Sequence, residues 1–282
     1  MKAIKTIIWV ALFLVISFVG FLLYETQDEI NATSENMDEV LQKLHNQKKM
    51  VGFAVSVFDS EKVIYENAFG FADRENQISY DINTQQYIAS ISKTTIGIAL
   101  MKAEELGLLK VEDGINQHLP FEINNPKFPN NEITLFQLVT HTSSLEYNEK
   151  VVESLYVADS AKNKSLAQFV NNYFQDGGYG EVTFSEYAPG ENWSYSNIGA
   201  GLVAYVIEHK SGMPFSEFTK KYIFEPLEME NTFWFESDAD STKHSGYYEP
   251  QDKSVSKVST SGVQLYPCRD MITDVHDLTK YC

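Results

Sequence analysis

The stretch QQYIASISKTTIGIALMKAEELG, residues 85–107, decides how the rest of the sequence is interpreted. It places Ser90 and Lys93 three positions apart, at the start of an apolar run of helical period that closes on Gly107. Residues three apart share one face of a helix. The two side chains can therefore touch if the helix begins at or just before Ser90.

A serine and a lysine in this arrangement can carry chemistry. A serine hydroxyl is a poor nucleophile without a base, and a lysine amine is a base only after losing its proton. Burial and the positive end of a helix dipole both favour that loss. The alternative is that Ser90 or Ser92 caps the helix and Lys93 is solvated. The same spacing between Ser254 and Lys257 has no apolar helix behind it, and we reject it.

A second motif enters another apolar helix. Tyr195 and Asn197 lie in the segment APGENWSYSNIGAGLVAYVIEHKSG. A tyrosine hydroxyl can relay a proton, and an asparagine amide can hold both a lysine and a substrate carbonyl. Tyr65 and Asn67 have the same spacing, but they fall inside an expected strand. We interpret that second tyrosine as part of the packing of a sheet.

Composition excludes several classes of function. The chain has 282 residues, 43% of them apolar, which is enough for one large domain or two small ones. Its net charge of −17 argues against nucleic acid as a partner, and we interpret the acidity as favouring solubility. No Cys-His cluster has the spacing of metal ligands, so we expect no zinc site. We also expect no cofactor, because hydrolysis by a serine and a lysine needs none.

The N-terminus has the pattern of a membrane segment. Lys2 and Lys5 precede the uncharged apolar run 6–24, which is about long enough to cross a bilayer. The lysines predict that the N-terminus stays inside and that the rest is exported. We expect residues 1–24 to be a transmembrane anchor, with a cleaved signal peptide as the alternative. Residues 25–36 are polar and are expected to form a linker.

Hydrophobic periodicity indicates the next elements. Residues 37–45 form an amphipathic helical pattern, and segments 51–59 and 63–73 alternate as two strands of a hairpin. Helical patterns dominate from Ser90 to about residue 227. A second polar stretch follows at 237–262, and no closing strand is predicted after it.

The last segment, DVHDLTKYC, begins like a helix capped by Asp274 or Asp277. Cys268 and Cys282 flank this helix. Even a short helix separates its ends by about 10 Å, whereas the Cα atoms of a disulfide lie within about 7 Å. We therefore predict two free thiols.

These motifs together resemble serine hydrolases of the β-lactamase and penicillin-binding-protein group. The nearest type is that of class C β-lactamases and D-alanyl-D-alanine carboxypeptidases. The resemblance runs from about residue 51 to the end of the chain. It is carried by segments that occur in the same order along the chain as in the group: NAFGFAD, IASISKTT, EELGLLKVEDGINQHLP, ITLFQLVTHTSSL, APGENWSYSN, IFEPLEMENT and MITDVHDLTKY.

The resemblance implies an α/β fold, with a mainly antiparallel sheet flanked by helices. It places the hydrolase domain at residues 37–282 and an inserted helical lobe at about 90–235. It implies a small-molecule or peptide substrate, which could be a β-lactam, a D-amino-acid peptide or a small ester. Neither the choice among these nor the oligomeric state follows from the sequence.

The resemblance also assigns roles to residues. Ser90 corresponds to the acylated nucleophile and Lys93 to its general base. Tyr195 and Asn197 correspond to the second catalytic element. His141, in THTSSL, corresponds to a loop segment that supports the site, and we interpret it as structural.

Two positions depart from the pattern of this group. Ser144 stands where a glycine is usual, and Arg269-Asp270 stand where a pair of glycines is usual. Glycine permits backbone conformations that other residues resist. Local loop shapes are therefore expected to differ at these positions.

The third motif of the group, Lys or His followed by any residue and Gly, is not found at its place in the order of motifs. The segments 210–212 (KSG) and 244–246 (HSG) occur too early, and we reject both. The group draws one oxyanion donor from the strand that carries this motif, and losing such a donor costs on the order of 10²–10³ in rate. We expect either an incomplete reading of a longer protein or a decayed copy. The alternative function is a non-catalytic module that binds cell-wall peptide or a partner.

Overall fold

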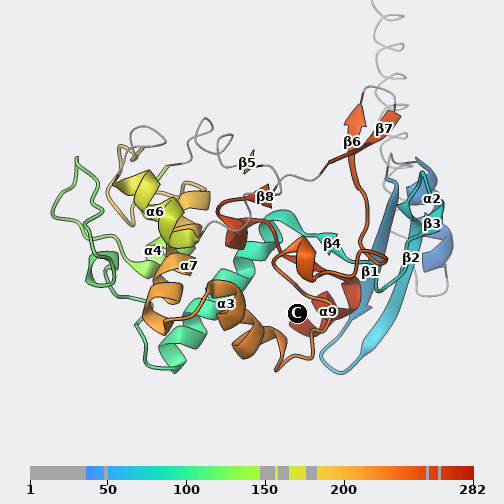
Figure 1. The fold of residues 1–282 in the computed structure, drawn as a ribbon, viewed down its shortest axis with the longest axis horizontal. Helices are drawn as coiled ribbons and strands as arrows, with labels where there is room; N and C mark the ends of the chain where they lie inside the picture. The colour runs from blue at the N-terminus through green and yellow to red at the C-terminus, as the bar shows by residue number, and fades with distance from the viewer. Residues whose placement is uncertain are drawn as a thin grey trace, which may run out of the picture.

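The computed structural model describes residues 36–47, 50–146, 156–157, 165–175, 183–251, 254–259 and 262–282. The segment expected to be an anchor, residues 1–24, and nearly all of the linker 25–36 lie outside these ranges. Within the ranges, no helix combines the length and the hydropathy that crossing a bilayer requires. Figure 1 shows most helices gathered on one side of the molecule and the strands β1 to β3 on the other.

The predicted hairpin is confirmed. Strands β1 (Gly52–Phe58) and β2 (Val63–Asp73) pair antiparallel, and β3 (Ile78–Ser79) adds to β2 to give the order β1-β2-β3. Phe53 lies opposite Phe69 in the register, and their rings stack with centroids 5.4 Å apart. Such cross-strand aromatic pairs stabilise a sheet and help to set its register.

Helix α2 (Met37–Gln47) packs against β2, close to the predicted bounds. The carboxylate of Asp38 accepts hydrogen bonds from the Tyr65 hydroxyl at 2.6 Å and from the Asn67 amide at 2.8 Å. The Tyr65 and Asn67 pair therefore holds α2 on the sheet, in agreement with its rejection as a catalytic motif.

Helix α9 (Val275–Tyr281) contacts β1 and is the helix expected near the end of the sequence. Asp274 is its N-cap and accepts the backbone N–H of Asp277 at 2.7 Å. Asp277 is fully buried and accepts the backbone N–H of Asn231 at 2.6 Å. The first turn of α9 is thus tied to the segment that follows the helical part of the chain.

Helix α7 lies at the centre of the helical part. Every residue from Ile198 to Ile207 is buried, because the helix contacts α3, α4, α6 and α8. A helix enclosed in this way is apolar on all sides, which explains the long apolar run in its sequence. The bounds of these helices are Ser92–Glu105 (α3), Leu135–Val139 (α4), Leu166–Phe174 (α6), Asn197–Ser211 (α7) and Phe215–Thr219 (α8).

The remaining named elements among the described residues are short. The 3₁₀ turns are Ala89–Ile91 (η1), Ile115–Gln117 (η2), Glu236–Asp238 (η5) and Tyr266–Cys268 (η6), and Lys220–Phe224 (η4) is π-helical. The paired strands are Gln86–Tyr87 (β4) with Ile272–Thr273 (β9), and Tyr156–Val157 (β5) with Gly262–Val263 (β8). The β4-β9 pair brings the segment before Ser90 beside the segment that follows η6.

The polar stretch 237–262 contains a strand pair that was not predicted from the sequence. Strands β6 (Tyr247–Gln251) and β7 (Ser254–Val258) form an antiparallel hairpin there, visible in Figure 1. It is held by polar contacts, including a 2.7 Å ion pair between Lys257 and Asp73. A strand pair held by polar side chains shows no hydrophobic alternation, which is the signal used to predict strands.

Candidate active site

Ser90 lies in the turn η1, immediately before α3. Its side chain is exposed, and no described residue accepts a hydrogen bond from its backbone N–H. The preceding residue, Ala89, has φ +47°, a left-handed conformation that costs a residue with a Cβ roughly 1–2 kcal/mol. Such strain concentrates at functional sites, where the surrounding structure enforces it.

Lys93 lies one turn further along and is half-buried. Its Nζ donates to the Ser90 Oγ at 3.0 Å and to the backbone carbonyl of Cys268 at 2.6 Å. The expected contact between serine and lysine is therefore present. The carbonyl of Cys268 fixes the amine beside the hydroxyl.

Tyr195 reaches the same hydroxyl from the other side. Its OH donates to the Ser90 Oγ at 2.8 Å, and its ring lies 5.0 Å from the Lys93 Nζ. The tyrosine precedes α7, whose N-cap Ser196 accepts the backbone N–H of Gly199 at 3.0 Å. The packing of α7 against α3 thus brings together two motifs that are distant in sequence.

Asn197 is the first residue of α7, and its place in the site differs from the expectation. Its backbone carbonyl accepts the Cys268 thiol at 3.1 Å. Its side-chain amide makes no hydrogen bond to Lys93 or to any other described residue. The expected grip of this amide on the lysine is therefore absent, and the amide remains available to another group.

Ser92 faces away from this cluster. Its fully buried hydroxyl donates to the Ala89 carbonyl at 2.6 Å and accepts the backbone N–H of Met271 at 3.1 Å. Ser92 therefore joins the start of α3 to the segment before β9. Of the two serines in this stretch, only Ser90 has contact with both the amine and the phenol.

His141 lies closer to the site than expected. Its Nδ1 accepts the backbone N–H of Ser196 at 3.2 Å, and its ring centroid is 4.7 Å from that of Tyr195. Burial, together with the positive charge of Lys93, lowers the pKa of His141 below its usual range. The ring is therefore part of the surroundings of the site.

The two departures from glycine have different consequences. Ser144 has φ +66°, so this position does require the left-handed conformation that glycine adopts easily. Its buried hydroxyl accepts the Asn125 amide at 3.3 Å, which offsets part of the strain. Arg269 has φ −153° and needs no glycine. The buried carboxylate of Asp270 accepts the backbone N–H of Val263 at 2.9 Å and so holds this loop.

The role of Cys268 as a connector was not predicted. Its carbonyl holds Lys93 and its thiol holds the Asn197 carbonyl, so one residue contacts both motifs. Backbone carbonyls occur at every position and carry no sequence signal. Only the buried cysteine itself could have drawn attention to this position.

The prediction of two free thiols is confirmed, with Cys268 buried and Cys282 exposed. Burial, with a smaller contribution from Asp270, raises the pKa of the Cys268 thiol to about 12. Because the thiolate is the reactive form, we expect iodoacetamide at pH 8 to label Cys282 quickly and Cys268 only after unfolding. Peptide mapping after native and denaturing labelling measures this. Equal labelling of both residues in the native protein would contradict the buried environment.

The two segments rejected as the third motif, 210–212 and 244–246, have structural roles. Gly212 ends α7 with φ +70°, the left-handed conformation usual after a helix. Ser245 donates its backbone N–H to the carbonyl of Gln85 at 2.8 Å and belongs to a connection before β6. The side chains of Lys93 and Tyr195, which donate to the Ser90 Oγ, belong to neither segment.

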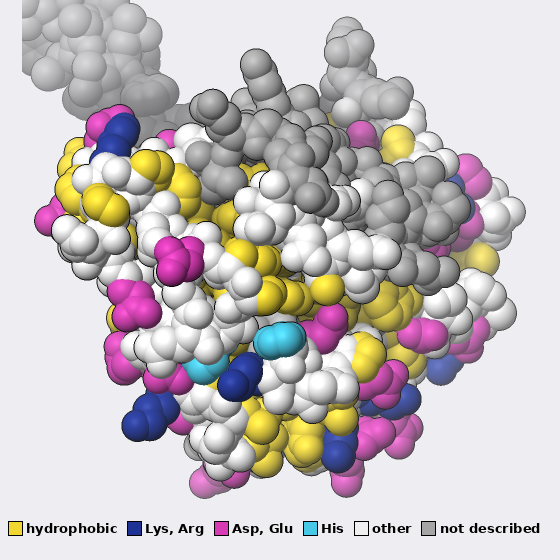
Figure 2. Space-filling model, turned by 60° about the vertical axis from the view of Figure 1, so that its left-hand side comes forward, with side chains coloured by type: hydrophobic (Ala, Val, Ile, Leu, Met, Phe, Trp, Pro, Cys, Tyr) yellow, Lys and Arg dark blue, Asp and Glu magenta, His cyan; other side chains and the backbone are white. Residues whose placement is uncertain are grey.

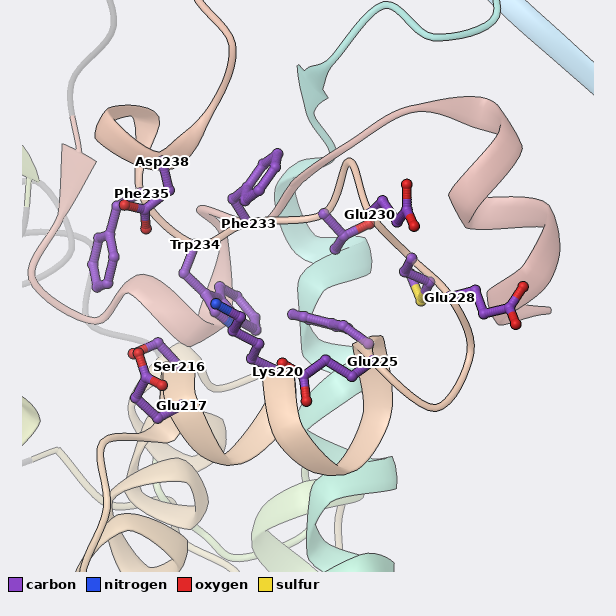
Figure 3. A pocket seen from close by; sticks show the side chains of 13 residues that line it. Ser216, Glu217, Lys220, Glu225, Glu228, Glu230, Phe233, Trp234, Phe235 and Asp238 are labelled. Carbon is purple, nitrogen blue, oxygen red and sulfur yellow. The ribbon is translucent and has the colours of Figure 1, made fainter.

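A separate pocket of about 660 Å³ lies beside α8 and η4, and Figure 3 shows its aromatic and acidic side chains. None of the four candidate residues lines it. On the face shown in Figure 2, acidic side chains are scattered over the surface rather than collected in one patch. Among the described residues, no group of three or more His, Cys, Asp or Glu side chains is arranged to hold a metal ion.

A family model described as Beta-lactamase matches residues 37–282. The chain belongs to this beta-lactamase family. The predicted resemblance to β-lactamases and penicillin-binding proteins is thereby confirmed.

Curated relatives in this family are longer than the chain. The PbpX protein of Bacillus subtilis (strain 168), which carries the name of a penicillin-binding protein, is 25% identical over 261 residues. The aligned region covers 91% of the chain and 60% of PbpX. Protein flp of Staphylococcus aureus (strain MW2) is 24% identical, with 89% of the chain and 48% of flp covered. The chain thus spans about half to three-fifths of the length of these beta-lactamase relatives.

Solved structures confirm the beta-lactamase fold. EstCE1, a hydrolase with promiscuous acyltransferase activity, matches with a TM-score of 0.72 at 20% identity, over 88% of this chain and 71% of its own. The D-amino acid amidase of Ochrobactrum anthropi SV3 matches with a TM-score of 0.71 at 20% identity, over 89% of this chain and 69% of the amidase. A class C beta lactamase matches with a TM-score of 0.69 at 21% identity, over 89% of this chain and 65% of its own. The predicted α/β class, with antiparallel sheets and flanking helices, is confirmed.

Proposed function

We propose that this member of a serine hydrolase family cleaves an amide or ester through an acyl-enzyme on Ser90. The observation that carries the proposal is the convergence of two groups on one hydroxyl, with Lys93 at 3.0 Å and Tyr195 at 2.8 Å from the Ser90 Oγ. A nucleophile within hydrogen-bond reach of a base is the arrangement that covalent catalysis requires.

The proposed reaction begins with attack of the Ser90 Oγ on the substrate carbonyl carbon. The hydroxyl proton passes to the Lys93 amine, which acts as the general base, and the Ser90 N–H stabilises the developing oxyanion. The bond to the leaving nitrogen or oxygen then breaks. Tyr195 gives the leaving atom a proton and recovers one from Lys93. Water attacks the acyl carbon, releasing the carboxylic acid and restoring the hydroxyl of Ser90.

The proposed role of Asn197 is to hold the substrate. Its amide is not engaged by described residues and lies two positions from Tyr195, at the start of α7. An amide N–H can donate to a substrate carbonyl. Because the amide does not touch Lys93, we no longer assign it the second task of positioning the lysine.

The substrate is proposed to be a β-lactam, a D-amino-acid peptide or a small ester. The similarity in fold to a beta lactamase, a D-amino acid amidase and a hydrolase with acyltransferase activity supports this range. The chemistry shared by these substrates is a carbonyl carbon with a nitrogen or oxygen leaving group. No metal or organic cofactor takes part in the proposed steps.

The experiment uses the 282-residue chain and two covalent probes, a fluorescent penicillin and a fluorophosphonate. We expect intact-mass spectrometry to find one label per chain and peptide mapping to place it on Ser90. If both probes leave the mass of the folded protein unchanged, the acyl-enzyme proposal is wrong. Retention of the fluorescent penicillin without a mass change would instead support a non-catalytic binding module.

We further propose that residues 1–24 anchor the protein in a membrane, with the remaining chain outside the cytoplasm. The charged start and the apolar run of the sequence support this proposal. We expect the full chain to sediment with membranes and a chain lacking residues 1–24 to remain in the supernatant. Soluble mature protein that begins near residue 25 would show instead that the segment is a cleaved signal peptide.

A further inference from the structure

His141 accepts two backbone hydrogen bonds from the segment around Tyr195. Its backbone carbonyl accepts the N–H of Ser194 at 2.8 Å, and its Nδ1 accepts the N–H of Ser196 at 3.2 Å. These two donors lie on either side of Tyr195. The backbone that carries the tyrosine is therefore held from one residue on a separate loop.

The ring of His141 also contacts the aromatic side chains of this segment. Its centroid lies 4.7 Å from the ring of Tyr195 and 6.2 Å from that of Trp193, with the Trp193 contact edge to face. The tyrosine in turn donates to the Ser90 Oγ at 2.8 Å. A continuous set of contacts thus runs from the imidazole to the nucleophile.

We propose that His141 is a positioning residue that holds Tyr195 on Ser90, and that it does so only as a neutral imidazole. This inference rests on the proposed function and adds a pH-sensitive element to it. An Nδ1 that accepts a hydrogen bond carries no proton, so the neutral ring has its proton on Nε2. Protonation of Nδ1 would place its N–H against the N–H of Ser196 and break one of the two hydrogen bonds.

The charges around the ring favour the neutral form. The structure places Trp193 and Tyr195 against the ring, and the charged group that acts on it is Lys93 of α3. Burial and this positive charge keep the pKa of His141 below its usual range. The acceptor is therefore intact at neutral pH and is lost as the pH falls through that lowered pKa.

The backbone of His141 restricts which substitutions can test the proposal. Its φ is +61°, in the left-handed region, where asparagine is tolerated better than most residues. Asparagine also offers an Oδ1 acceptor close to the position of Nδ1 but does not titrate. His141→Asn is therefore the conservative variant, and His141→Leu is the variant that removes the acceptor while keeping bulk.

The first test measures acylation of the full chain by a fluorophosphonate as a function of pH. We expect His141→Leu to lower the maximal acylation rate on the order of 10–100-fold at pH 7, with little change in probe affinity. We expect His141→Asn to restore most of that rate and to lose the ionisation of His141 from the acid limb. Unchanged acylation in His141→Leu, or an unchanged acid limb in His141→Asn, would overturn the proposal.

The second test does not depend on activity. Trp193 is 62% exposed and lies beside the ring, so its fluorescence is expected to change as the pH is lowered from 7 through the lowered pKa of His141 and the segment moves. We expect Trp193→Phe and His141→Asn each to abolish this change. A flat titration in the parent protein would overturn the proposal. If the parent does not acylate but the titration behaves as expected, the acyl-enzyme proposal fails and the grip of His141 on the segment stands.

Discussion

Ser90→Ala is expected to abolish covalent labelling by both probes, with the protein still folded. The side chain of Ser90 is exposed, and its hydroxyl serves Lys93 and Tyr195 rather than the core. Removing it therefore deletes the nucleophile and leaves packing intact. Labelling is measured by intact mass and folding by the melting temperature. Labelling of a folded Ser90→Ala protein at the parent rate would exclude Ser90 as the nucleophile.

Ser92→Ala is the matched control, two residues away in the same stretch. Its hydroxyl is buried and accepts the N–H of Met271, which would be left without an acceptor. An orphaned buried donor costs roughly 1–3 kcal/mol, so the melting temperature should fall. Labelling of the folded fraction should persist. The two serines are thus expected to separate catalysis from stability.

Lys93→Arg tests the base. Arginine keeps the positive charge but stays protonated at any working pH, so it cannot accept the serine proton. We expect the acylation rate to fall on the order of 10²–10⁴-fold, the usual contribution of a general base. A folded Lys93→Arg protein that acylates as fast as the parent would rule out the lysine base, whatever the result for Ser90.

Gly201→Val is expected to have the largest effect on stability. Gly201 lies in the buried part of α7, where an added Cβ would come within 2.4 Å of the Leu265 side chain. Leu265 is 1% exposed, so its side chain or the helix must shift within a packed core. Overpacking of this kind costs about 3 kcal/mol, which corresponds to a fall of roughly 10 °C in melting temperature.

The same substitution should also reduce acylation, because Leu265 immediately precedes η6 and the Cys268 carbonyl that holds Lys93. Gly199→Ala is the matched control on the same helix. Its Cβ would meet Leu138 and Ser196 at 3.4 Å, and alanine favours the helix by about 1 kcal/mol. We expect its melting temperature to stay near that of the parent. A Gly201→Val protein as stable as the control would contradict this packing of α7.

Several features could be predicted because they depend on neighbours in sequence. Positions three apart meet in a helical turn, so the spacing predicted the contact between Ser90 and Lys93, although Ser90 lies in the 3₁₀ turn η1 and α3 begins at Ser92. The hairpin of β1 and β2 follows from alternating apolar residues, and the two free thiols follow from the length of α9. In each case the geometry is set by the backbone over a few residues.

The hairpin of β6 and β7 was missed for a physical reason. It is tied to the rest of the fold by polar groups such as Asp73 and Arg74, which lie far away in sequence. The stretch therefore lacks the apolar face that marks most strands. The absence of a hydrogen bond between the Asn197 amide and Lys93 could not be predicted for a related reason, since it depends on how α7 packs against α3.

The sequence by itself determined the family, the candidate nucleophile and base, and the spacing of three residues that lets Ser90 and Lys93 meet. Only the tertiary structure decided that the Cys268 carbonyl holds Lys93, and that His141 grips the backbone on both sides of Tyr195. The first kind of information is local, because the helical repeat fixes which nearby side chains meet. The second kind depends on backbone N–H and C=O groups, which are alike at every position and gain a role only when packing brings distant segments together.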